Sequence, residues 1–228
     1  MSRPQRIALF GGTFDPIHAG HLRSARAVGR KLGLDRIFFI PASLPPHKAR
    51  PDMAPAADRY RMVRLAAAGR QGWTASPIEI LAGGTSWSIR TIERMRRRFP
   101  RARLFFITGA DAFREIKTWR EWRRVLDSCT FVVTTRPGAD LAASVRGLGR
   151  TFADRVMTLG PGEAVLEAEL RPGRILLLPI EALAVSSTAI RDRARRGESL
   201  RGLVPPAVAA YIKAKGLYRP PRRLRTHR

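Results

Sequence analysis

Short apolar runs alternate along this chain with longer stretches in which apolar residues recur every three or four positions. The runs predict buried strands, and the periodic stretches predict amphipathic helices that cover them. We expect strands at 7–10, 36–40, near 73–80, and at 103–107, 130–135 and 175–180. We expect helices from about residue 18 and at 56–68, 88–99, 119–126, 141–148, 187–196 and 206–215, with loops between 149 and 172.

The order of these elements predicts the fold class. A strand, a helix and a second strand at this spacing favour a right-handed crossover between parallel strands. We therefore expect an α/β fold with a single doubly wound, Rossmann-like parallel sheet and C-terminal helices. With no repeat and no linker, residues 1–218 form one predicted domain, and the basic segment 219–228, RPPRRLRTHR, is expected to lack ordered structure.

Charge and composition limit the kinds of molecule that this protein is expected to bind. The chain has 43 basic and 18 acidic residues, a net charge of +25, which is typical of proteins that bind nucleic acid or polyanions. The charges are spread along the whole sequence, so a field that attracts small polyanions explains them equally well. We expect no specific nucleic acid and, without a run of eighteen apolar residues, no membrane. A single cysteine, Cys129, excludes an internal disulfide, and we expect a cytoplasmic protein.

Candidate functional residues follow the expected strands. Ligands of parallel sheets bind outside the carboxyl ends of the strands, so these residues are expected to converge. His18 and His21 follow the first strand, and His47 and Lys48 follow the second. Asp111 follows a later strand, after the small residues 108–110, and the segment 186–191 follows the last one.

The stretch IALFGGTFDPIHAGHL predicts a phosphate site. Two glycines release the strand into a tight loop, and the next helix begins near His18, where free amides and the positive helix end favour an anion. His18 and His21 lie on one face of that helix. A zinc site is the alternative, but it needs His47 and a carboxylate as further ligands and leaves the glycines unexplained. The later segment VSSTAIR suits a phosphate in the same way, or is an ordinary capped helix start.

These motifs resemble a known family. GGTFDPIHAGHL is similar to the T/HxGH signature of the nucleotidylyltransferase superfamily, and VSSTAIR is similar to its ISSTxxR motif. PASLPPHK, GGTSWSIRTI, FFITGAD, KTWREW and YIKAKGLY follow in family order, so the resemblance narrows to bacterial nicotinate-nucleotide adenylyltransferases and covers 7–218. It implies transfer of the adenylyl group of ATP to nicotinate mononucleotide, which gives deamido-NAD and pyrophosphate.

The resemblance also implies roles for individual residues. Catalysis is expected from His18, His21 and Arg191. ATP is expected to contact Gly11, Gly12, Thr13, Phe14, His18, His21, Ile107, Gly109, Asp111, Ser187, Thr188 and Arg191. The mononucleotide is expected to contact Thr13, His47, Lys48, Ser88 and Trp119. The implied cofactor is Mg²⁺, carried mainly by ATP because the motifs offer few carboxylates, and no protein metal site is expected.

Three residues depart from the family pattern on the pyridine side. Trp87 stands where the family usually has Tyr, Ser88 where it usually has Thr, and Arg120 replaces a frequent aromatic residue. A sister activity on nicotinamide mononucleotide therefore stays open. So do a non-enzymatic nucleic-acid-binding role and assembly into a homo-oligomer.

Overall fold

The computed structural model describes residues 3–46, 50–135, 145, 148–160, 162–181 and 183–219. Within these ranges one sheet holds all the strands, in the order β3-β2-β1-β4-β5-β7-β6, and every neighbouring pair is parallel. The strands are β1 (Arg6–Gly12), β2 (Arg36–Pro41), β3 (Trp73–Ala75), β4 (Arg103–Gly109), β5 (Thr130–Thr135), β6 (Val156–Thr158) and β7 (Ile175–Pro179). The strand order reverses between β1 and β4, which is where such sheets bind ligands.

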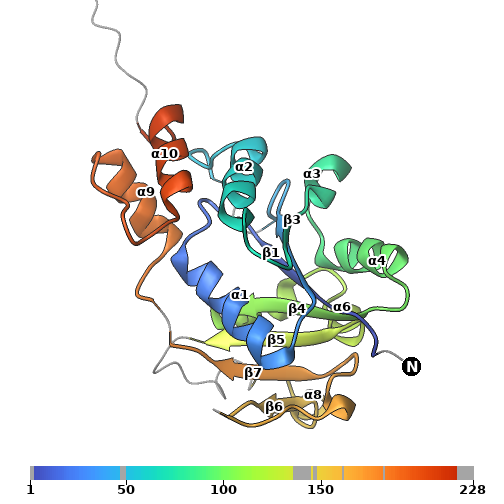
Figure 1. Ribbon diagram of the computed structural model, residues 1–228. Coiled ribbons are helices and arrows are strands. Elements are labelled where there is room, and N and C mark those ends of the chain that lie inside the picture. Colours follow the sequence, from blue (N-terminus) through green and yellow to red (C-terminus); the bar gives the residue numbers. More distant parts are fainter. Residues whose placement is uncertain are drawn as a thin grey trace, which may run out of the picture.

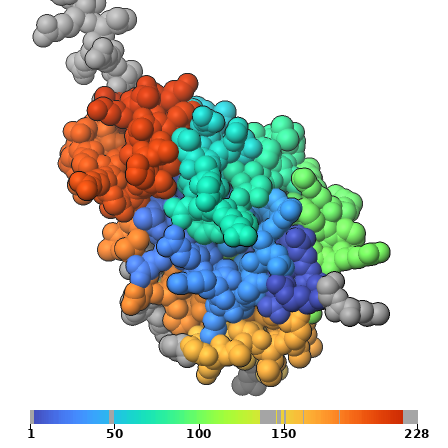
Figure 2. All heavy atoms as spheres, viewed as in Figure 1, coloured from blue at the N-terminus to red at the C-terminus, as the bar shows by residue number. Residues whose placement is uncertain are grey.

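Helices cover both faces of the sheet (Figure 1). They are α1 (Ala19–Leu32), α2 (Ala56–Ala67), α3 (Ile78–Ala82), α4 (Ser88–Arg98), α5 (Ala110–Arg114), α6 (Trp122–Asp127), α8 (Arg150–Ala153), α9 (Ser187–Arg195) and α10 (Pro206–Lys215), with short 3₁₀ turns η1 (Ile116–Thr118) and η2 (Glu167–Glu169). Figure 2 shows the outer surface of α1 in blue, between α2 and the orange region near β6 and β7.

The strand pleat divides the core into two clusters. Along β1, Ala8 and Phe10 face one side, where they join the apolar residues of α1, α2, α9 and α10. Ile7 and Leu9 face the other side, which α4, α5 and α6 cover. The spacing of apolar residues in α1 works as the sequence predicts, because Leu22, Ala25 and Val28 are all buried. The doubly wound α/β fold is confirmed.

The structure corrects several element boundaries. The strand expected near 73–80 ends at Ala75, because Pro77 cannot donate to a ladder, and Ile78–Ala82 is helix α3. The helix expected at 119–126 begins at Trp122, since Glu121 has a left-handed backbone. β4 runs to Gly109 and enters α5 directly, where small residues suggest a loop. β6, which pairs with β7, and α8 lie where loops are expected.

Two expectations fall outside the described residues. Most of the expected helix at 141–148 lies there, as does the basic segment beyond residue 219. In the part of the chain that the structure describes, no helix has the length and apolar character needed to cross a bilayer.

Candidate active site

β1 delivers a tight loop at the point where the strand order reverses. Gly12 lets the Phe14 ring pack closely on the backbone, because a Cβ at position 12 would come within 3.2 Å of that ring. Phe14 has a positive φ of 48°, which non-glycine residues rarely adopt, and its ring is buried 5.7 Å from that of Phe10. Core packing of one aromatic side chain therefore holds the loop that follows the glycines.

His18 and His21 form a stacked pair at the start of α1. Their ring centroids are 3.7 Å apart with an interplanar angle of 27°, and His18 is only 8% exposed. The backbone N–H of His18 donates to Nδ1 of His21 at 3.2 Å. Because Nδ1 of His21 accepts this bond, the ring carries its proton on Nε2 and can donate from there. The edge of Phe14 packs against His21 at 5.1 Å and fixes the ring further.

The start of α9 is hydrogen-bonded to this same loop. The Ser187 hydroxyl donates to the carbonyl of Pro16 at 3.1 Å, and Nη1 of Arg191 donates to the carbonyl of Asp15 at 2.8 Å. Nη2 of Arg191 donates to the Thr188 hydroxyl at 3.0 Å. Two segments about 170 residues apart in sequence thus form one unit. We call residues 11–21 and 186–191 together the histidine end of the site.

Arg191 is a buried cation at this end. It is 3% exposed, and burial, with the neighbouring Arg50, lowers its pKa below the usual range. Ser186 caps α9 by accepting a bond from the Ala189 amide at 3.2 Å, so the helix start is ordered as VSSTAIR predicts. The N-termini of α1 and α9 and one guanidinium therefore place positive potential in one region, which suits a polyanion.

A cavity of about 150 Å³ extends from the glycine loop to a second group of residues. Gly11, Gly12 and Thr13 line one side of it. Glu79, Ser86, Trp87, Ser88 and Trp119 line the other side, and we call these five residues the tryptophan end. Trp119 packs edge-on against Phe106 at 5.9 Å. Ser88 is the first residue of α4, as the sequence suggests.

Glu79 is a buried carboxyl group that the sequence analysis did not single out. The Thr91 hydroxyl donates to its Oε1 at 2.5 Å, which joins α3 to α4. Burial raises the pKa of Glu79 above its usual value, while the bonds from Thr91 and Ser86 oppose this. The signal in the sequence was weak, because an isolated Glu in a short helix is usually exposed.

Arg59 is a second residue that the sequence analysis missed. It is fully buried, and its guanidinium donates to the carbonyls of Ala54, Thr13 and Ser43 at 3.0, 2.8 and 2.9 Å. Burial lowers its pKa. Its position offered a signal, because Arg59 shares the apolar face of α2 with Met62 and Val63. It connects the loops after β1 and β2.

Asp15 completes this framework beneath the loop. Its carboxylate is almost fully buried and accepts bonds from Tyr218 at 2.8 Å, from the Ala54 amide at 3.2 Å and from Arg50 at 2.6 Å. Burial and the Asp15 carboxylate raise the pKa of Tyr218 far above its usual range. Tyr218, three residues beyond the end of α10, therefore reaches the loop that follows β1.

The remaining expected residues are placed as follows. Ile107 is fully buried, so only its backbone is available to a ligand, and Gly109 is exposed at the start of α5. Asp111 lies in the first turn of α5 with its side chain 72% exposed, paired with Arg114 at 2.5 Å. His47 and Lys48 lie outside the described residues.

In the described ranges, no group of three or more His, Cys, Asp or Glu side chains is arranged to hold a metal ion. Asp15, a carboxylate within the loop, already accepts three hydrogen bonds. A metal at this site would need most of its ligands from a bound nucleotide.

Comparisons with known proteins agree with this geometry. A family model described as cytidylyltransferase-like matches residues 9–193. A probable nicotinate-nucleotide adenylyltransferase of Thermus thermophilus is 40% identical, covering 94% of this chain and 100% of the relative. A protein of the same name from Desulfitobacterium hafniense is 39% identical, covering 95% of this chain and 97% of the relative.

Solved structures show the same fold at low identity. The nicotinic acid mononucleotide adenylyltransferase of Plasmodium falciparum, complexed with NaAD, is similar with a TM-score of 0.71 and 15% identity, covering 94% of this chain and 97% of that one. The same Plasmodium protein complexed with APC gives a TM-score of 0.69 at 14% identity, with the same two coverages.

Proposed function

The chain belongs to the cytidylyltransferase-like family and, within it, to the family of its relatives named nicotinate-nucleotide adenylyltransferase; we propose that it transfers the adenylyl group of ATP to nicotinate mononucleotide. The products are deamido-NAD and pyrophosphate. The observation that carries this proposal is the pair of bonds from Ser187 and Arg191 to the carbonyls of Pro16 and Asp15. They support a single triphosphate pocket built from both ends of the domain.

ATP binds at the histidine end in this proposal. Neutral His21 donates from Nε2 to a phosphate oxygen, and His18, stacked on it, faces the same phosphates. Ser187, Thr188 and Arg191 hold the far phosphates from α9. Gly11, Gly12, Thr13 and Phe14 form the loop beneath the nucleotide, and Ile107, Gly109 and Asp111 take the adenosine from the end of β4.

Nicotinate mononucleotide binds at the tryptophan end. Thr13, Ser88 and Trp119 lie around one cavity, and Trp119 offers a flat apolar face to a pyridine ring. We assign His47 and Lys48 to the mononucleotide phosphate, because they come after β2 in the sequence, in the stretch that leads from β2 to α2. The cavity adjoins the glycine loop, which supports in-line attack on the α-phosphate.

The reaction needs charge stabilisation more than proton transfer. The attacking group is a phosphate oxygen that is already ionised near neutral pH, so no general base is required. The protein aligns two polyanions and stabilises the charge that develops on the α-phosphate and on the leaving pyrophosphate. Mg²⁺ bound by the ATP oxygens would supply further charge neutralisation at this point.

We also place the activity in the cytoplasm, where ATP is available as a substrate. Cys129, the single cysteine, is buried and unpaired, and burial raises its pKa to about 12. A free thiol is typical of proteins from a reducing compartment.

The test is pyrophosphate release from ATP over a panel of mononucleotides. We expect the highest kcat/KM with nicotinate mononucleotide and a lower value with nicotinamide mononucleotide. No release with any mononucleotide, together with salt-dependent DNA binding that His21→Ala leaves unchanged, would favour the non-enzymatic alternative. Preference for nicotinamide mononucleotide would keep the adenylyl transfer and overturn the acceptor.

A further inference from the structure

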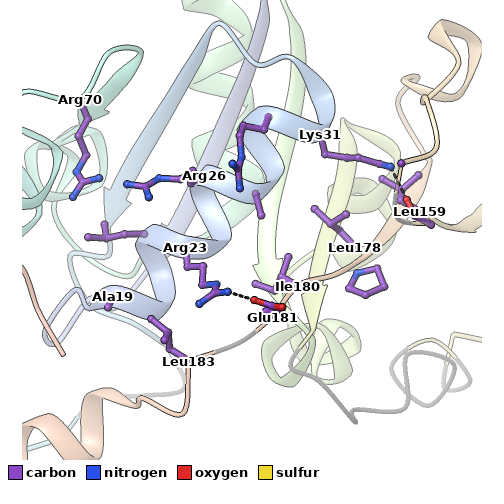
Figure 3. A pocket seen from close by; sticks show the side chains of 16 residues that line it. Ala19, Arg23, Arg26, Lys31, Arg70, Leu159, Leu178, Ile180, Glu181 and Leu183 are labelled. Atoms are coloured by element: carbon purple, nitrogen blue, oxygen red, sulfur yellow. Dashed lines mark hydrogen bonds and ion pairs between the residues drawn. The ribbon is translucent and has the colours of Figure 1, made fainter. Parts of the chain in front are cut away.

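A large hollow runs along the outer face of α1, away from the cavity described above. Its volume is about 860 Å³, which is in the range of pockets that hold whole small molecules. α1 forms one wall, the turn after α2 contributes Arg70, and the segments around β6 and β7 form the opposite wall (Figure 3). We call it the basic groove. It approaches the histidine end only at Ala19.

Cations line one side of the basic groove. Arg23, Arg26 and Arg30 are spaced three and four residues apart on α1, so they share one helix face. Arg23 pairs with Glu181, the only acidic residue that lines the groove in the described ranges. Within those same ranges, the side chains of Arg26 and Arg30 make neither a hydrogen bond nor an ion pair. Two like charges four residues apart repel each other, and a bound anion would relieve that repulsion.

Arg70 also lines the basic groove, and two contacts hold its side chain in place. Its Nε donates to the carbonyl of Ala66 at 3.1 Å, and its guanidinium lies 5.0 Å from the centroid of the Trp73 ring. In Figure 3 the side chains of Arg70 and Arg26 extend toward each other across the groove. A cation fixed at its stem loses little conformational freedom when it binds an anion, and it keeps its remaining donors free.

The floor of the groove is aliphatic. Leu22, Leu159 and Leu178 are buried beneath it, and Ile180 and Leu183 continue the apolar surface. Lys31 anchors the far wall, because its Nζ donates to the carbonyls of Gly160 and Glu163 at 2.7 and 2.5 Å. The hollow thus combines a fixed apolar floor with a row of guanidiniums on one side.

We propose that the basic groove is a second nucleotide site, which binds a nucleoside di- or triphosphate outside the site of adenylyl transfer. The guanidiniums would hold the phosphates, and the apolar floor would contact the base and sugar. A flat bilayer cannot reach leucines at the bottom of a hollow. Proteins that bind single-stranded nucleic acid stack bases on aromatic rings, and no aromatic side chain lines this groove in the described ranges.

The proposal is tested by calorimetric titration of the full-length protein with ADP. Wild type is expected to show two classes of site, one at the histidine end and one in the groove. The double variant Arg26→Glu/Arg30→Glu should keep the first class and bind about tenfold or more weakly at the second, because it loses two charge-assisted contacts. Its kcat/KM for adenylyl transfer, measured without ADP and at ATP concentrations that leave the groove empty, should equal that of wild type.

A matched control changes the same charge elsewhere. Arg97 and Arg101 are exposed, lie outside the groove and make no ion pair in the described ranges, so Arg97→Glu/Arg101→Glu should keep both classes of site. Arg26→Gln/Arg30→Gln gives a milder variant for which correct folding is easier to secure.

Three results would overturn the second site. The first is a single class of site in wild type, and the second is unchanged binding in both groove variants. The third is a groove that binds inorganic tripolyphosphate or a single-stranded oligonucleotide as tightly as ADP, since the assignment to nucleotides would then be wrong. Failure here leaves the proposed transfer reaction untouched, because that reaction is assayed without ADP.

Discussion

The two ends of the candidate active site are held by different parts of the chain. At the histidine end, buried donors from α2 and α9 bind backbone carbonyls, with Arg59 on Thr13 and Arg191 on Asp15. At the tryptophan end, one side-chain pair, Glu79 with Thr91, joins α3 to α4. Backbone carbonyls are present whatever the side chain, so the first arrangement fixes the path of the loop. The second depends on two particular side chains.

This contrast has a consequence for substitutions. A change in the framework of the histidine end should affect folding and turnover together, because many segments meet there. A change at the tryptophan end should alter the mononucleotide pocket and leave most of the fold intact. The variants below separate the two ends, beginning with the largest expected effect.

His21→Ala should lower kcat by about a hundredfold or more, because it removes one preorganised donor to the transferring phosphates. The fold should survive, since His21 lies in the first turn of α1 and belongs to neither buried apolar cluster. Single-turnover adenylyl transfer and circular dichroism measure the two effects. Near-normal turnover in a folded variant would contradict the assigned role.

Arg59→Met should reduce the free energy of unfolding by about 3 kcal/mol, because three carbonyls lose a buried donor. Turnover should fall as well, since the loops after β1 and β2 lose their connection. The matched control is Arg61→Met on the exposed side of the same helix, for which a change within about 0.5 kcal/mol is expected. Equal urea midpoints for the two variants would refute the role of Arg59.

Glu79→Gln, at the tryptophan end, should change how the free energy of unfolding depends on pH. Burial raises the pKa of Glu79 in the folded state above its usual value of 4.5, so folding favours the protonated carboxyl group. Its contribution to stability is therefore complete below the unfolded pKa and is lost as the pH rises through the folded pKa. The variant keeps an acceptor for Thr91 and avoids this loss.

Urea unfolding at pH 4 and pH 7 measures this effect. The stability of Glu79→Gln relative to wild type should be higher at pH 7 than at pH 4. Glu181→Gln serves as the control, because the Glu181 side chain is 85% exposed. A Glu79→Gln protein whose relative stability is the same at both pH values would show that the buried carboxyl group does not titrate as proposed.

Tyr218→Phe should have the smallest effect, a loss of about 1 kcal/mol in unfolding free energy. Asp15 would lose one of its three hydrogen bonds but keep those from Ala54 and Arg50. Tyr211→Phe is the matched control, because its hydroxyl also donates to a carboxylate, Asp58, at a more exposed position. A larger loss in the control than in Tyr218→Phe would contradict the view that the buried bond to Asp15 contributes more to stability than the exposed bond to Asp58.

Features that depend on local sequence patterns could be predicted from the sequence. The parallel sheet follows from the apolar runs and their spacing. The contact of Arg191 with the loop after β1 follows from both segments coming after strands of one sheet. Ser88 at the start of α4 was also predictable, because it precedes a periodic apolar stretch.

Other features depend on tertiary contacts that no local pattern encodes. Asp15 looks like a loop residue until Tyr218, about 200 residues later, is seen to bind it. β6 has only three residues, too few for its own sequence to give a clear signal. It forms because the edge of β7 is free to pair with it. The basic groove is another case, since Arg70 joins the arginines of α1 only in the folded chain.

The central claim is that the segments around His21 and Arg191 act on one triphosphate. A double-mutant cycle of His21→Ala with Arg191→Lys, read in single-turnover adenylyl transfer, tests it most directly. Residues that act on a shared partner are not additive, so the double variant should be at least about tenfold more active than the product of the two single losses predicts. Losses that simply multiply, as we expect for His21→Ala with the distant Arg97→Gln, would contradict a single shared pocket.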